Sequence, residues 1–115
     1  MAGFLKVVDI KYDMPDAGLA IRRVTYNIRN GKVLGAAAVK FIHGYGSTGK
    51  GGRIRVETRR YLEEQRQKRR IRGFITGEDF SIFDEPTRAA FALCDDLRRD
   101  PDLDRHNNGV TIAIL

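Results

Sequence analysis

The chain has 115 residues, of which 42% are hydrophobic and 31% are charged, a composition that suits one folded domain. The apolar runs are too short for a membrane span, and Met1 to Lys6 contain no apolar signal core, so we expect no export. With Cys94 as its one cysteine, the chain has no internal disulfide, and we expect a cytoplasmic protein with Cys94 buried on a helix.

The N-terminal part of the chain alternates strand and helix signals. Residues 4–11 are rich in β-branched and aromatic side chains and predict a strand. A helix is expected from the Asp13–Asp16 segment, because Pro15 suits a first turn, and the Asn30–Gly31 pair predicts its end. Residues 36–43 are short and largely apolar, as expected for a central strand.

A glycine-rich loop and a basic helix follow. Residues 44–52 contain five glycines and predict a loop, after which residues 53–70 have helical spacing. The inward seam of this helix is predicted to consist of Ile54, Thr58, Tyr61, Leu62 and Gln65. A stripe beside the seam is formed by Arg55, Arg59, Arg66 and Arg70.

The C-terminal part predicts two strands around a third helix. Residues 71–76 favour a strand, the Asp84–Pro86 segment favours a helix start, and residues 100–108 favour an acidic turn region. The apolar side of the helix is predicted to carry Ala90, Leu93, Cys94 and Leu97. Residues 110–115 predict a final strand.

The predicted order β-α-β-α-β-α-β indicates a single α/β domain over residues 1–115. We expect a two-layer or sandwich arrangement with a mainly parallel sheet of four strands. The last strand is expected to be antiparallel or to lie at an edge.

The net charge of +6 is distributed unevenly. Residues 50–73 carry ten basic and three acidic side chains, whereas residues 74–115 carry four basic and nine acidic ones. This concentration favours a polyanionic partner over a general role in solubility, although a solvated face with local ion pairs is the simpler alternative. The basic helix lacks the apolar face of an interfacial helix, so we expect no membrane partner.

A strand, a glycine loop and a basic helix in succession form a favourable arrangement for binding an anion. Glycines let the backbone approach a phosphate, and the N-terminus of the next helix carries a partial positive charge. The alternative is a surface loop that needs glycine only for its turns. The predicted phosphate-binding residues are Lys11, Gly44, Tyr45, Gly46, Ser47, Gly49, Lys50, Arg53, Arg55 and Arg59.

Two nucleotide motifs fit this loop poorly. Gly44, Gly49 and Lys50 match a Walker A loop, but Gly51 stands where a serine or threonine would hold magnesium. Gly44, Gly46 and Gly49 match the dinucleotide fingerprint, but they follow the second predicted strand instead of the first.

The segment Val39–Gly46 (VKFIHGYG), the basic helix ending in Tyr61–Leu62 and the terminal Gly109–Ile112 (GVTI) together resemble the Smr (small MutS-related) domain family. The resemblance implies nucleic-acid binding and, as in several members, nicking or endonuclease activity on DNA or RNA. It also implies that residues 78–108, with the third helix, are an insertion into the usual compact form.

The candidate catalytic residues are Asp9 and His43. A histidine where a strand meets a loop suits a general base or a phosphate contact, and Asp9 could orient it or bind a metal. Each residue also has a simpler interpretation, as a polar strand end or a solvated carboxylate. Where the family has a histidine and a glycine at the end of the first strand, this chain has Lys11 and Tyr12. That departure weakens the expectation of nuclease activity more than the expectation of binding.

The sequence predicts no cofactor and no metal site, because His43 and His106 are its only histidines and no cysteine cluster supports them. For a nuclease activity, the sequence leaves open whether a divalent metal is needed. The nucleic acid is expected to be bound by its backbone or shape, and Tyr45 could stack on a base. A non-catalytic protein-interaction domain and a binder of a small phosphorylated ligand are the alternatives. No pattern indicates an oligomeric state.

Overall fold

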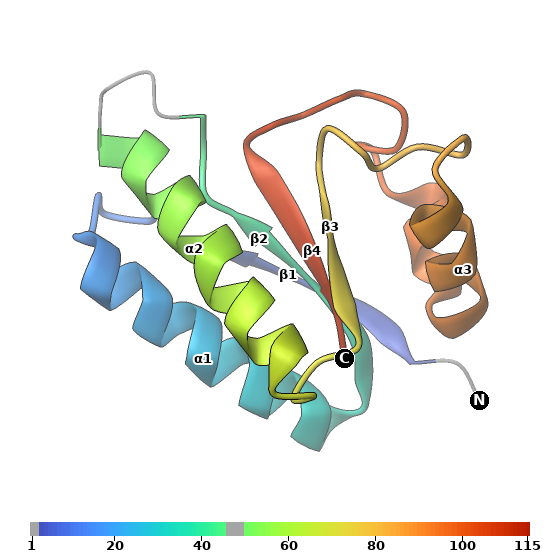
Figure 1. Cartoon of the computed structure of the whole chain (residues 1–115), viewed down its shortest axis with the longest axis horizontal. Helices are drawn as coiled ribbons and strands as arrows, with labels where there is room; N and C mark the ends of the chain where they lie inside the picture. Colours follow the sequence, from blue (N-terminus) through green and yellow to red (C-terminus); the bar gives the residue numbers. More distant parts are fainter. Residues whose placement is uncertain (1–2, 46–49) are drawn as a thin grey trace.

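A computed structural model describes residues 3–45 and 50–115. Its sheet has four strands in the order β1 (Phe4–Asp9), β2 (Ala36–Ile42), β4 (Val110–Ile114) and β3 (Gly73–Thr76) (Figure 1). β1 and β2 are parallel, while β4 is antiparallel to both of its neighbours. Three strands therefore run in one direction, and the last strand runs against them, as expected. An edge position for this strand was wrong, because β4 lies between β2 and β3, and all five of its residues are buried.

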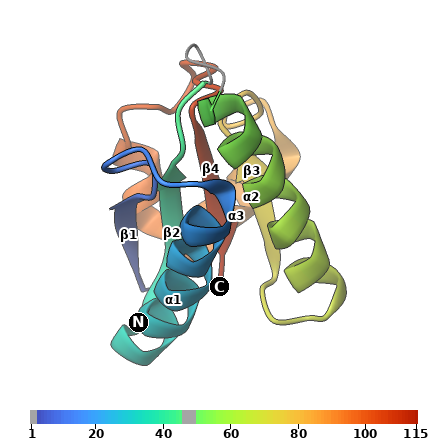
Figure 2. The same ribbon diagram turned by 90° about the vertical axis from the view of Figure 1, so that its left-hand side faces the viewer.

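Helices cover both faces of the sheet. α1 (Ala17–Leu34) and α2 (Lys50–Gln67) lie on one face, and α3 (Glu85–Leu93) with the 3-10 helix η1 (Asp95–Arg99) covers the other (Figure 2). The crossovers through α1 and α2 advance across the sheet in the same direction, so right-handed connections put both helices on one face. Of the two arrangements expected from the sequence, the structure has the sandwich.

The alternation of side chains along the strands produces two hydrophobic cores. Val39 and Phe41 of β2 and Ala113 of β4 pack under α1 and α2. Ala38 of β2 and Ile112 of β4 point the other way, toward α3 and η1. The predicted inward seam of α2 is confirmed, since four of its members are buried and Tyr61 is partly buried.

The end of α1 differs from the sequence-based expectation. The helix begins after Asp16, whose carboxylate caps the N–H of Leu19 at 2.8 Å, and it ends at Gly35, which has a φ of 85°. The predicted stop at Asn30–Gly31 was wrong. Gly31 lies inside the helix, and a Cβ there would stand 3.3 Å from Val39, so glycine allows close packing of α1 on β2.

The other boundaries shift by a few residues. α2 begins at Lys50, three residues before the predicted start at Arg53, so Gly51 and Gly52 belong to its first turn. α3 begins after its N-cap Asp84, as predicted, but ends at Leu93. Cys94 and Leu97 are fully buried beyond that end, and burial raises the pKa of the Cys94 thiol.

A buried ion cluster, not recognised in the sequence, fixes the acidic turn region to the sheet. The Lys40 side chain of β2 is only 6% exposed, and its Nζ donates to both carboxylate oxygens of Asp100, at 2.9 and 3.0 Å, and pairs with Asp102. Burial alone would lower the pKa of Lys40, but these hydrogen bonds and charges raise it. The ammonium is therefore charged, and residues 100–102 are held against β2.

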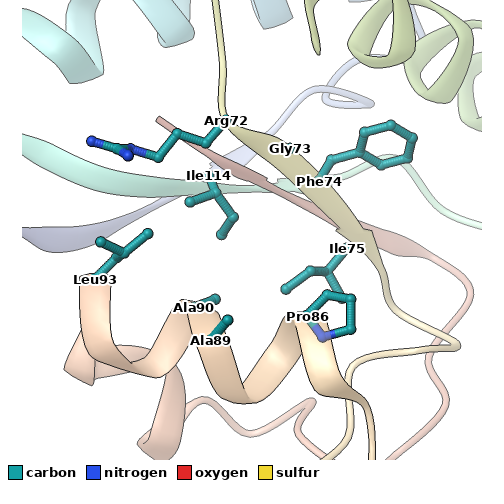
Figure 3. Close-up of a pocket in the computed structure, with 9 residues that line it drawn as sticks. All are labelled: Arg72, Gly73, Phe74, Ile75, Pro86, Ala89, Ala90, Leu93 and Ile114. Carbon is teal, nitrogen blue, oxygen red and sulfur yellow. The ribbon is translucent and has the colours of Figure 1, made fainter.

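An apolar groove runs between β3 and α3 (Figure 3). Ile75 and Ile114 contribute side chains from the sheet, and Ala90 and Leu93 contribute from the helix, whereas the ring of Phe74 points away, toward the core under α1 and α2. Among the described residues, no helix is long and apolar enough to cross a lipid bilayer.

Thr58 supplies a test of the packing of α2. Its hydroxyl is fully buried and has no hydrogen-bond partner among the described residues. Burial of an unpaired hydroxyl lowers the free energy of unfolding. We expect Thr58→Val to raise the free energy of unfolding by about 1 kcal/mol, because valine keeps the shape without the polar group. Urea unfolding measures the change, with Thr58→Ala as the control that leaves a cavity. A destabilised valine variant would show that the hydroxyl has a partner in solution.

Candidate functional site

The candidate site lies at the end of the sheet that is formed by the carboxyl ends of β1, β2 and β3. The segment His43–Tyr45 leaves β2 there, β4 begins beside it, and the N-terminus of α2 returns to the same end (Figure 1). The carboxyl ends of strands are the usual place for ligands in open α/β sheets. The structure therefore places His43–Tyr45 and the N-terminus of the basic helix α2 at the same end of the sheet.

His43 is completely buried, and both nitrogens of its ring are engaged. Nδ1 lies 3.0 Å from the carbonyl oxygen of Gly44, and Nε2 lies 2.8 Å from the hydroxyl oxygen of Thr111. Because a carbonyl oxygen only accepts, Nδ1 carries the proton and Nε2 accepts from Thr111. The Nε–H of Arg59 donates in turn to the Thr111 oxygen, at 3.0 Å. The result is a directed chain from α2 through β4 to the end of β2.

The surroundings keep His43 neutral. Burial is the largest cause and lowers its pKa, while the hydrogen bond with Gly44 raises it. The positive charges of Arg59 and Arg55 lower the pKa, the negative charge of Glu78 raises it, and the net result is a pKa of about 4. At neutral pH the imidazole is uncharged, and its basic nitrogen is occupied by Thr111. In this arrangement, His43 fixes the position of its neighbours.

Arg59 is held by an ion pair that the sequence did not suggest. Its two terminal nitrogens donate to the two carboxylate oxygens of Glu78, at 2.9 and 2.7 Å. These bonds lower the pKa of Glu78, and the Arg59 side chain is only 20% exposed. Arg59, predicted as a phosphate contact, is thus engaged by Glu78 and Thr111.

Gly44 and Gly109 allow two chain segments to meet closely. The backbone N–H groups of His43 and Gly44 both donate to the carbonyl oxygen of Gly109, at 3.0 Å each. Gly44 has a φ of 78°, a left-handed value that favours glycine. A Cβ at Gly109 would lie 2.9 Å from the ring of Tyr45, so this ring packs directly on the Gly109 backbone while the side chain stays 60% exposed.

Asp9 and His43, the two predicted catalytic residues, are not in contact. The Asp9 carboxylate accepts from the backbone N–H of Lys11 at 2.9 Å and lies 3.6 Å from its Nζ. Its neighbours Val8 and Ile10 pack in the core under α1 and α2, so strand alternation directs Asp9 to the opposite face from His43. Lys11 is the residue near the glycine segment, since a Cβ at Gly44 would lie 3.2 Å from its Cδ.

Two cations at the start of α2 remain available. Arg53 is exposed and Arg55 is half-buried, and neither forms an ion pair with any residue that the structure describes. The charge of Arg55 acts on both His43 and Glu78, which places its guanidinium near the site. The first turn of α2 contains no acidic residue. Gly46, Ser47, Gly49 and the side chain of Lys50 lie outside the described residues.

The roles of Thr111, Glu78 and Gly109 in the site were not predicted from the sequence. The Gly-x-Thr pattern at positions 109–111 was noted only as part of the family resemblance, and Glu78 was assigned to an insertion. Within residues 3–45 and 50–115, no group of three or more histidine, cysteine or carboxylate side chains is placed to hold a metal ion.

No protein-family model matches the chain, and no curated protein matches it. A solved structure does: the crystal structure of the Smr domain of Thermus thermophilus MutS2 superposes with a TM-score of 0.59, over 96% of each chain. The chain has the fold of an Smr domain. At 20% sequence identity, the likeness is one of architecture, and it confirms the predicted Smr-like fold. The expectation that residues 78–108 are an insertion stays a prediction.

The hydrogen-bond chain predicts different effects for two substitutions of Thr111. Thr111→Val removes the donor to His43 and the acceptor of Arg59, and we expect it to lower the free energy of unfolding by about 2 kcal/mol. Thr111→Ser keeps the hydroxyl and should cost less. Equal losses in the two variants, measured by urea unfolding, would mean that the hydroxyl contributes nothing.

His43 predicts a pH dependence of stability. The unfolded chain protonates His43 near its ordinary pKa of 6.5, whereas the folded chain does so only at about 4. Protonation therefore favours unfolding, and stability contributed by this group falls by up to about 3 kcal/mol as the pH drops through that window. Urea unfolding of wild type and His43→Gln at several pH values isolates the effect. Identical pH profiles would contradict it.

Proposed function

We propose that the chain is a nucleic-acid-binding domain that holds a phosphate backbone at the edge formed by Lys11, Arg53 and Arg55. The observation that supports this best is the pairing pattern at the site. Glu78 neutralises the partly buried Arg59, whereas Arg53 and Arg55 have no acidic partner among the described residues. The Arg59–Glu78 pair has no net charge, whereas uncompensated cations at one end of the sheet attract a polyanion.

The geometry supports binding better than hydrolysis. A general base needs a nitrogen within reach of a water or a hydroxyl, but Nε2 of His43 is occupied by Thr111 and Nδ1 by Gly44. Asp9 lies on the other face of the sheet and cannot orient His43 from there. Nicking by Asp9 and His43 stays a prediction, and nicking of a supercoiled plasmid by wild type but not by Asp9→Asn would support it.

Recognition through the backbone follows from the residue types at this edge. Arginine and lysine contact phosphates regardless of base, and the exposed Tyr45 offers one ring for stacking. The packing of this ring on Gly109 holds it in place before a ligand arrives. We therefore propose preference for nucleic-acid shape or strandedness and little preference for sequence.

Fluorescence anisotropy with labelled single- and double-stranded DNA and RNA over a salt series tests the proposal. For a duplex, we expect Arg53→Ala/Arg55→Ala to weaken binding and to reduce the slope of log K against log salt by about 2, near 0.9 for each lost contact. The control is Arg98→Ala/Arg99→Ala, which removes two exposed arginines from η1 in the other layer.

Two results would contradict this function. One is no binding to any of the four nucleic acids at low salt. The other is an equal loss in the control variant, which would mean that net charge alone governs binding. Competition by free nucleotides as effective as by oligonucleotides would favour a small phosphorylated ligand instead.

A further inference from the structure

A second basic surface lies at the far end of α2 from the candidate site. An open groove there has a volume of about 610 Å³, and its lining contains five cationic residues and no acidic one. The lining residues are Lys32, Arg66, Arg69, Arg70, Ile71, Arg72 and Leu115. An adjoining hollow between α1 and α2 shares Lys32 and Arg70, so the basic surface extends across both helices.

Compensation of helix dipoles does not account for this charge. α1 and α2 both end near the groove, and each C-terminus carries about half a negative charge. Lys32 serves that purpose in part, because its Nζ donates to the carbonyl oxygen of Arg70, and Glu63 pairs with Arg66. Roughly three of the five positive charges remain uncompensated after the Arg66–Glu63 pair and the two helix ends are taken into account.

Arg69 occupies a backbone position that favours glycine. Its φ is 59°, its N–H donates to the carbonyl oxygen of Arg66, and the N–H of Arg70 donates to that of Gln65. This is the Schellman pattern, in which the left-handed residue is usually glycine. An arginine here is strained by its Cβ, so the chain carries the cation at a cost in stability.

The charges along α2 are separated into two groups. Arg59 pairs with Glu78 and Arg60 with Glu57 in its middle, and Arg66 pairs with Glu63 in its last turn. Arg53 and Arg55 lie before these pairs, and Arg69 and Arg70 lie after them. An 18-residue helix is about 27 Å long, which equals the rise of about 8 base pairs of duplex.

We propose that Lys32, Arg69 and Arg70 form a second phosphate-binding surface, and that one nucleic acid lying along α2 contacts both ends of the helix together. The inference rests on the proposed function and adds a minimum length to it. A nucleic acid shorter than α2 reaches one surface only. A nucleic acid that spans the helix makes its second contact as an intramolecular step. The overall affinity then rises, although neither surface by itself binds more tightly.

The test compares hairpins with stems of about 5 and about 14 base pairs, which fall short of α2 and exceed it. We expect wild type to bind the long hairpin at least about tenfold more tightly than the short one. Arg69→Gly/Arg70→Ala should lose most of this gain but bind the short hairpin within about twofold of wild type, because Arg53 and Arg55 are intact. Arg72 is left unchanged, since Figure 3 shows it at the end of the apolar groove beside α3.

Arg69→Gly alone separates binding from folding. Glycine relieves the left-handed strain, so we expect the Tm to rise by about 3 °C while the gain for the long hairpin falls. Arg98→Ala/Arg99→Ala, which removes as many charges as Arg69→Gly/Arg70→Ala but takes them from η1, should keep the gain. The second surface is refuted if Arg69→Gly/Arg70→Ala retains the gain for the long hairpin, or if it loses affinity equally for both hairpins. If neither hairpin binds to wild type, the proposed function itself fails.

Discussion

The pairing of β4 with β2 on one side and β3 on the other is the constraint on which the rest of the structure depends. The crossover through α2 leaves one strand position open in the sheet, and the last strand of the chain fills it. Ile112 thereby reaches the core under α3, and Ala113 reaches the core under α1 and α2. The same placement sets Thr111 beside His43, so the architecture and the candidate site both depend on the position of β4.

The candidate site combines a rigid interior with a charged exterior. His43 is buried and neutral, and the Gly109 carbonyl holds the backbone that carries it. Arg59 and Glu78 tie α2 to the region after β3. A surface prepared in this way loses little conformational entropy on binding, which favours affinity for a ligand held mostly by charge. The network gives His43 and Gly109 a structural role in this site.

Charge is used in two ways along α2. The exposed ion pairs Arg60–Glu57 and Arg66–Glu63 contribute little to stability, because pairs of this kind are worth less than about 1 kcal/mol. Their effect is to remove positive charge from that stretch, so that Arg53 and Arg55 at one end are separated from Arg69 and Arg70 at the other. A helix that was basic along its whole length would attract any anion anywhere. In our proposal, two separated groups select for a polyanion long enough to reach both.

The sequence by itself determined the order of helices and strands, the apolar seam of α2 and the basic character of residues 50–73, because these depend on local periodicity and composition. The end of α1 predicted from the sequence was wrong, because Gly31 does not end the helix. It lies inside the helix, where glycine allows close packing on β2. Only the tertiary structure decided the position of β4, the pairing of Arg59 with Glu78 and the separation of Asp9 from His43. Those features depend on contacts between residues distant in the chain, and no local pattern carries them.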